Sequence, residues 1–249
     1  MIRQITTPVR VFESSLDMSN QVASEIATLI KKEPEALICI AAGHTSLGLF
    51  HCLSALYEKR ELDFSKAAFV AMDEWLGMSP SSSQSCGDFL TKEFLDKVNF
   101  QPDRVCLIDA SVENPEVECL RVEQFILDHS KLGVIQYLVL GSGMNGHIAL
   151  NEPGTEFNMR THVTNLDRIT TEVGQKYFEK TTELTGGITL GIANFNESER
   201  CVLMINGQKK RSILNRILNE PVGKDIPATA VRKFPNASIY CDRDAFGDL

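Results

Sequence analysis

Short apolar runs alternate along this chain with longer segments in which apolar residues recur at helical spacing. Apolar runs bounded by turn residues predict buried strands, and the helical spacing predicts amphipathic helices. The predicted strands are Ala36–Ala41, Ala67–Met72, Arg104–Ile108, Val134–Leu140, Arg200–Ile205 and Ser238–Cys241. The predicted helices are Ser19–Lys32, Ser46–Lys59, Gly87–Val98, Val117–His129 and Lys209–Leu218.

Strands that alternate with helices favour a mainly parallel sheet with helices on both faces. The expected fold class is therefore α/β, a three-layer α/β/α arrangement around a doubly wound, Rossmann-like sheet. The stretches Gln101-Pro102-Asp103 and Asn114-Pro115-Glu116 are interpreted as connectors, and no repeat, low-complexity tract or linker interrupts the pattern. We expect residues 1–249 to form a single domain.

Composition narrows the classes of partner. The chain has 249 residues, 25 Lys+Arg and 33 Asp+Glu, which gives a net charge of −8 and argues against nucleic acid. No run approaches the ~18 apolar residues of a membrane-spanning helix. The start, Met1–Pro8, lacks the apolar core of a signal peptide. We expect a cytoplasmic protein with no membrane partner.

The seven cysteines form no Cys-x-x-Cys pair, and their number is odd. This pattern argues against a disulfide framework or a zinc cluster, so no metal site is expected. Cys39, Cys106, Cys201 and Cys241 lie in apolar, strand-like runs, where a thiol usually acts as a small buried hydrophobe. None of the seven is assigned a catalytic role.

Three polar loops directly follow predicted strands: Ala42–Ser46, Asp73–Gly87 and Gly141–Gly154. In open α/β sheets the ligand lies outside the carboxyl ends of the strands, so these loops should converge on one crevice.

The first loop, with Gly43, Thr45 and Ser46, joins a strand to a helix and has the groups that hold a phosphate. Its alternative interpretation is a tight turn in which Thr45 or Ser46 is the N-cap. The second loop opens with Asp73 and Glu74, whose side chains point in opposite directions if the strand continues. Asp73 is a candidate general base, and the alternative is an acidic pair that caps the following helix.

The third loop is rich in Gly, Asn, His and Glu, which is seldom structural directly after a buried strand. His147 and Glu152 are a pair able to move protons near neutral pH. Two cations are candidates for binding a phosphate: Lys209, which follows a predicted strand, and Lys176. A solvated basic turn and a helix-surface lysine are their respective alternatives.

At this point the sequence resembles the glucosamine-6-phosphate deaminase/isomerase family, which shares a fold superfamily with 6-phosphogluconolactonases. Gly141–Pro153 is similar to that family's Gly-His-Ile-Ala-Phe-Asn-Glu-Pro signature, Met72–Trp75 to its Asp-Glu-aromatic motif and Gly43–Ser46 to its phosphate loop. Gly187–Ile192 and Gly207–Lys209 echo further family segments, so the resemblance covers nearly the whole chain.

The resemblance implies that an aldosamine 6-phosphate is converted to a ketose 6-phosphate with release of ammonia, without a metal or organic cofactor. It implies that His147 helps to open the sugar ring, that Glu152 tunes and orients His147, and that Asp73 moves a proton between C2 and C1. The residues that would anchor the phosphate are Gly43, Thr45, Ser46, Lys209 and Lys176. The family includes monomers and oligomers, which leaves a homo-oligomer open.

Two departures from the family pattern matter. Asn145 stands where the family has an aspartate, and an amide cannot stabilise an imidazolium by charge, so Glu152 would have to hold the ring. The Asn-Gly-His variant is similar to the galactosamine-6-phosphate branch and favours that substrate. The first loop also lacks the usual leading threonine and closing proline. Two alternatives stay open, a 6-phosphogluconolactonase-type hydrolase and a non-catalytic sugar-phosphate sensor.

Overall fold

The computed structural model describes residues 7–247, so residues 1–6 of the segment Met1–Pro8 lie outside the described part. Its main sheet has seven strands: β1 (Val9–Phe12), β2 (Leu37–Ile40), β3 (Ala68–Val70), β5 (Val105–Cys106), β6 (Tyr137–Leu140), β9 (Cys201–Ile205) and β10 (Ala237–Asp242). Their spatial order is β1-β10-β9-β6-β2-β3-β5, and every neighbouring pair is parallel. All six predicted strands are present in this sheet.

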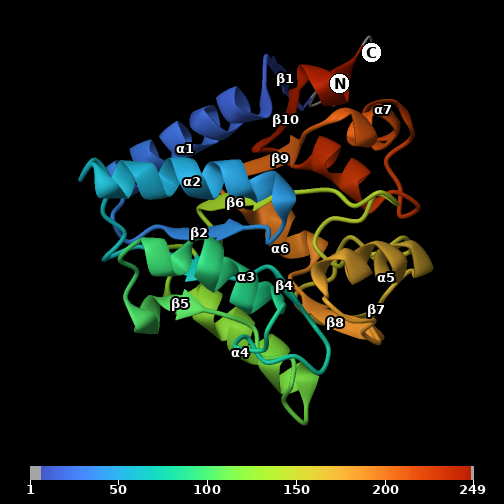
Figure 1. The fold of residues 1–249 in the computed structure, drawn as a ribbon, viewed down its shortest axis with the longest axis horizontal. Helices are drawn as coiled ribbons and strands as arrows, with labels where there is room; N and C mark the ends of the chain where they lie inside the picture. The colour runs from blue at the N-terminus through green and yellow to red at the C-terminus, as the bar shows by residue number, and fades with distance from the viewer. Residues whose placement is uncertain (1–6, 248–249) are drawn as a thin grey trace.

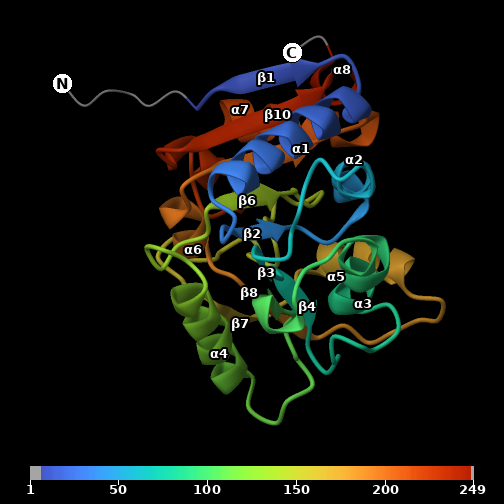
Figure 2. The same cartoon turned by 90° about the vertical axis from the view of Figure 1, so that its left-hand side faces the viewer.

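Helices cover both faces of the sheet, as the alternation predicts. They are α1 (Ser15–Lys32), α2 (His44–Glu58), α3 (Cys86–Glu93), α4 (Pro115–Asp128), α5 (Arg168–Gly174), α6 (Ile192–Glu197), α7 (Arg211–Asn219) and α8 (Arg243–Phe246). Helices α1 and α2 lie side by side over one face (Figure 1). In Figure 2, α1 lies in front of β10 and α7 lies behind it. The fold is therefore the expected three-layer α/β/α arrangement.

The strand order reverses between β2 and β6. From β2 the chain builds β3 and β5 outward, and then it places β6 on the other side of β2, where Ala41 N–H donates to the Val139 carbonyl at 3.0 Å. Such a reversal forms a crevice at the carboxyl ends of the two strands. The loops after β2 and β6 are two of the three polar loops that the sequence singles out.

A second, antiparallel sheet lies beside the first and was not predicted. Its strands are β4 (Asp73–Trp75), β8 (Gly186–Thr189) and β7 (His162–Asn165), in the order β4-β8-β7. The chain leaves the main sheet after β3, and Asp73 begins β4 instead of ending the predicted strand. The second loop therefore starts in a sheet of its own.

Two sequence interpretations are corrected at the helix ends. Asn114 is not part of a connector, because its side chain accepts the Glu116 N–H at 3.1 Å and caps α4, with Pro115 in the first turn. The helix predicted over Gly87–Val98 ends at Glu93, and a separate 3₁₀ turn, Leu95–Lys97, follows it. No described helix is long and apolar enough to cross a membrane.

Candidate active site

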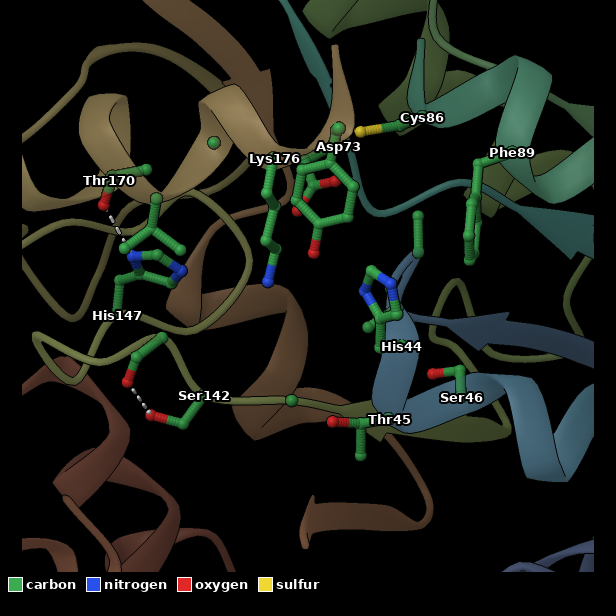
Figure 3. Close-up of a pocket in the computed structure, with 18 of the residues that line it drawn as sticks. His44, Thr45, Ser46, Asp73, Cys86, Phe89, Ser142, His147, Thr170 and Lys176 are labelled. Atoms are coloured by element: carbon green, nitrogen blue, oxygen red, sulfur yellow. Dashed lines mark hydrogen bonds between the residues drawn. The ribbon is translucent and has the colours of Figure 1, made fainter. Parts of the chain in front are cut away.

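A pocket of about 730 Å³ opens at the carboxyl ends of β2 and β6, beside β4. The three polar loops converge there, as expected, and α5 with the turn that follows it contributes a further wall (Figure 3). Eight of the nine predicted site residues line the pocket: Gly43, Thr45, Ser46, Asp73, Asn145, His147, Lys176 and Lys209. The ninth, Glu152, is buried next to the His147 ring.

The N-terminus of α2 faces this pocket. The interpretation of Thr45 or Ser46 as the N-cap is wrong, because the helix begins at His44 and Gly43 is its N-cap, with φ +151°. Both hydroxyls therefore lie within the first turn, and no described side chain caps the helix. The N–H groups of an uncapped first turn and the helix dipole favour an anion at this end.

The two adjacent carboxylates point to opposite sides of β4. Glu74 is buried and accepts the N–H groups of Cys86 at 3.0 Å and Gly87 at 2.9 Å, so it caps α3. Asp73 faces the pocket (Figure 3). The capping interpretation therefore holds for Glu74, and the general-base interpretation stays available for Asp73.

Burial controls the charge of both carboxylates. It raises the pKa of Asp73 to about 6, opposed by the Cys86 thiol and by His147, which favour the ionised form. Burial also raises the pKa of Glu74 to about 7, against the N–H groups that the carboxylate accepts. A carboxyl with a pKa of about 6 exchanges protons readily near neutral pH, which suits Asp73 to general acid–base work.

The His147 ring is held on two sides. A Cβ added to Gly143 would lie 2.3 Å from ring atoms Cε1 and Nε2, so the glycine backbone packs directly against the imidazole. On its other side, ring Nδ1 lies 2.9 Å from Thr170 Oγ1 and 3.4 Å from Glu152 Oε2. The edge that carries Nε2 is left for a ligand.

Asn145 supports the loop and Glu152 but does not hold the ring. Its Oδ1 accepts the His147 backbone N–H at 3.2 Å, and its Nδ2 donates to Glu152 Oε2 at 2.8 Å. Burial raises the pKa of Glu152, but hydrogen bonds and charge from His147, with smaller contributions from Thr170 and Asn145, outweigh it and lower the pKa. An ionised Glu152 therefore lies beside the imidazole, where the family pattern has a further aspartate.

Three lysines line the pocket opposite Asp73. Lys176 lies in the 3₁₀ turn Gln175–Tyr177 with Nζ 4.7 Å from the Tyr177 ring centroid, and Lys209 is exposed. Lys210, which was predicted only as part of a basic cluster, is half-buried and donates to the Ser142 carbonyl. Burial and then the Lys176 charge lower the pKa of Lys210 to about 8. Arg211, from the same cluster, donates instead to the Asp244 carbonyl.

Sequence reasoning missed several residues of this wall. Thr170 gave no signal, because its contact with His147 joins positions 23 residues apart. His44 was interpreted as a solvated turn residue, but its ring lies in the pocket with its centroid 5.6 Å from that of Tyr177 (Figure 3). Among residues 7–247, no three His, Cys, Asp or Glu side chains are grouped so as to hold a metal ion.

The parallel α/β fold, with a crevice that combines a helix N-terminus, lysines, a carboxyl and an imidazole, defines a sugar-phosphate enzyme of the three-layer α/β/α class. The sequence model described as glucosamine-6-phosphate isomerases/6-phosphogluconolactonase matches residues 13–239. This chain belongs to that family and is an enzyme of it.

The similar proteins agree with this assignment. The glucosamine-6-phosphate deaminase of Bacillus pumilus is 33% identical over 235 residues, which cover 94% of this chain and 96% of the relative. A solved structure described as a monomeric glucosamine-6-phosphate deaminase has a TM-score of 0.90 at 30% identity, covering 96% of this chain and 98% of that one. A 6-phosphogluconolactonase from Thermotoga maritima, 20% identical with a TM-score of 0.74, covers 95% of this chain and 99% of its own, and shows the shared fold alone.

Proposed function

We propose that this protein is an aldosamine-6-phosphate deaminase/isomerase that forms a ketose 6-phosphate and ammonia. One observation carries the proposal: Asp73 and His147 face the same pocket as the uncapped N-terminus of α2 and three lysines. A sugar phosphate needs an anion site at one end and acid–base groups at the other. The curated relatives named glucosamine-6-phosphate deaminase support the same reaction.

The phosphate would bind between Gly43–Ser46 and the lysines. The helix amides and the hydroxyls of Thr45 and Ser46 donate hydrogen bonds, and Lys176, Lys209 and Lys210 supply positive charge. Because the net charge of the chain is −8, attraction for an anionic substrate has to come from these local groups.

His147 would open the pyranose ring by moving a proton at the ring oxygen, with the ionised Glu152 stabilising its positive form. Asp73 would then take the proton from C2 and return it to C1. The resulting imine at C2 reacts with water, which releases ammonia and leaves the ketose. The base has to be in place before the ring opens, because C2 is acidic only in the open-chain form.

Glucosamine 6-phosphate is the first substrate, since the similar enzymes are named for it. Galactosamine 6-phosphate is the second candidate, which Asn145 favours through the similarity of Asn-Gly-His to that branch. We further propose that residues 1–249 form one domain that works in the cytoplasm without nucleic acid. The pocket residues all belong to one chain, so the site needs no homo-oligomer to be complete.

The test is ammonia release from each of the two epimers, measured separately with the purified protein. Release from either, with formation of the ketose 6-phosphate, supports the proposal, and the ratio of kcat/KM values assigns the epimer. Hydrolysis of 6-phosphogluconolactone without ammonia release assigns a lactonase instead. Binding of both sugar phosphates with turnover of none assigns a sensor.

A further inference from the structure

We propose that Thr170 is a positioning residue for His147: its hydroxyl accepts a hydrogen bond from ring Nδ1 and donates one to Glu152, which leaves Nε2 to act on the substrate. The proposal rests on the proposed function of His147 and adds to it a residue on α5. It also assigns the ring tautomer that the reaction uses.

The contacts around Thr170 are short and buried. Its Oγ1 lies 2.9 Å from His147 Nδ1 and 3.3 Å from Asn145 Nδ2, and only 4% of the residue is exposed. A hydrogen bond from Thr170 also favours the ionised form of Glu152 and lowers its pKa. One hydroxyl therefore lies among three polar groups with no water-exposed alternative.

The donors and acceptors of these groups allow one arrangement. The Asn145 amide nitrogen can only donate, and the ionised Glu152 can only accept. A hydroxyl has one proton to donate, and Glu152 is the acceptor that needs it. Thr170 Oγ1 must then accept from His147, so the neutral imidazole carries its proton on Nδ1.

The opposite side of the ring makes this placement strict. The Gly143 backbone packs against Cε1 and Nε2 so closely that a Cβ there would lie 2.3 Å away. The ring cannot retreat toward Gly143, and its Nδ1 edge is held at Thr170. Ile169 and Val173 of α5 line the pocket on either side of Thr170, so α5 carries both a pocket wall and the residue that orients the imidazole.

Three variants separate the hydroxyl from the shape of the helix. Thr170→Val keeps the volume and removes the hydroxyl, and Thr170→Ser keeps the hydroxyl. Thr171→Val is the matched control, because the Thr171 hydroxyl donates to the Asp167 carbonyl at 3.2 Å and does not line the pocket. We expect Thr170→Val to lower kcat about tenfold to a hundredfold with KM nearly unchanged, and the other two to retain most activity.

The tautomer can be measured without turnover. The chain has five histidines, and a ¹⁵N spectrum of His147→Gln identifies the His147 ring signals in the wild type. We expect protonated Nδ1 and bare Nε2 at neutral pH, and a mixture of tautomers in Thr170→Val. A wild-type ring protonated on Nε2 overturns the proposal, as does a Thr171→Val variant that loses as much kcat as Thr170→Val.

This readout stands apart from the proposed function. If the wild type releases no ammonia from either epimer, the proposed function fails, while the tautomer still decides the placement of the Thr170 hydroxyl. If Thr170→Val does not fold, the wild-type spectrum and the Thr170→Ser kinetics decide it.

Discussion

Replacing Gly143 by alanine should displace the His147 ring and leave the rest of the pocket in place. The added Cβ would lie 2.3 Å from Cε1 and Nε2, whereas ordinary contact begins at 3.4 Å. The ring must therefore move by about 1.1 Å, or swing to another rotamer and lose its 2.9 Å contact with Thr170. A misplacement of about 1 Å in a catalytic group costs roughly a hundredfold in rate.

Gly141→Ala is the matched control for this change. Gly141 lies in the same loop and lines the same pocket, but a Cβ there has nothing within 4 Å. We expect kcat for ammonia release to fall roughly a hundredfold in Gly143→Ala and less than about threefold in Gly141→Ala, with similar melting temperatures for both. Near-normal kcat in Gly143→Ala, or equal losses in the two variants, would refute the placement of His147 in the reaction.

Three further predictions follow from the charges. The value of kcat/KM should fall below about pH 6, as protonation removes the Asp73 base, and above about pH 8, as Lys210 loses its charge; Asp73→Asn should abolish turnover yet bind the sugar phosphate, and a variant that keeps the acid limb would contradict this assignment. Lys210→Ala should raise KM about tenfold to a hundredfold, more than the exposed Lys209→Ala, and an equal effect on steady-state KM would show that burial does not distinguish them. Tyr137→Phe should lower the free energy of unfolding in urea by about 1.5–3 kcal/mol at unchanged kcat, because the Tyr137 hydroxyl donates to the Glu25 carboxylate at 2.7 Å, and unchanged stability would count against that bond.

The main sheet was predictable because its strands are buried on both faces. Strands β2, β6 and β9 have all their side chains buried, so they stand out as continuous apolar runs between turn residues. Position in the sheet then predicted the site, since the loops after β2 and β6 meet at the reversal in strand order.

The smaller sheet was not predictable from apolar patterning. Strand β8 contains Gly186 and Gly187, which are poor strand formers. They are there because a Cβ on Gly186 would lie 2.5 Å from the Thr164 carbonyl oxygen, and a Cβ on Gly187 would lie 2.2 Å from Leu150 Cδ1. Close approach of three segments selects these glycines, and no local spacing reports it. Edge strand β1 is short and mostly exposed, so it carries no apolar run either.

Within the site, sequence reasoning found residues that lie in dense motifs and missed those that depend on long-range contact. His147 and Glu152 follow one another in a single loop, and alternation on β4 separated Asp73 from Glu74. Thr170 and Tyr177 reach the pocket from a segment whose placement depends on tertiary contact. The choice between Lys209 and Lys210 depends on the direction of the first helical turn after β9, which the run of cations does not reveal.

The most direct test of the central claim compares the two products in one reaction. The wild type is given glucosamine 6-phosphate, and galactosamine 6-phosphate in parallel, while ammonia and ketose 6-phosphate are measured together. Our account predicts that both products form in equal amounts from at least one epimer and that Asp73→Asn forms neither. Absence of ammonia with both epimers, or full turnover by Asp73→Asn, would contradict it.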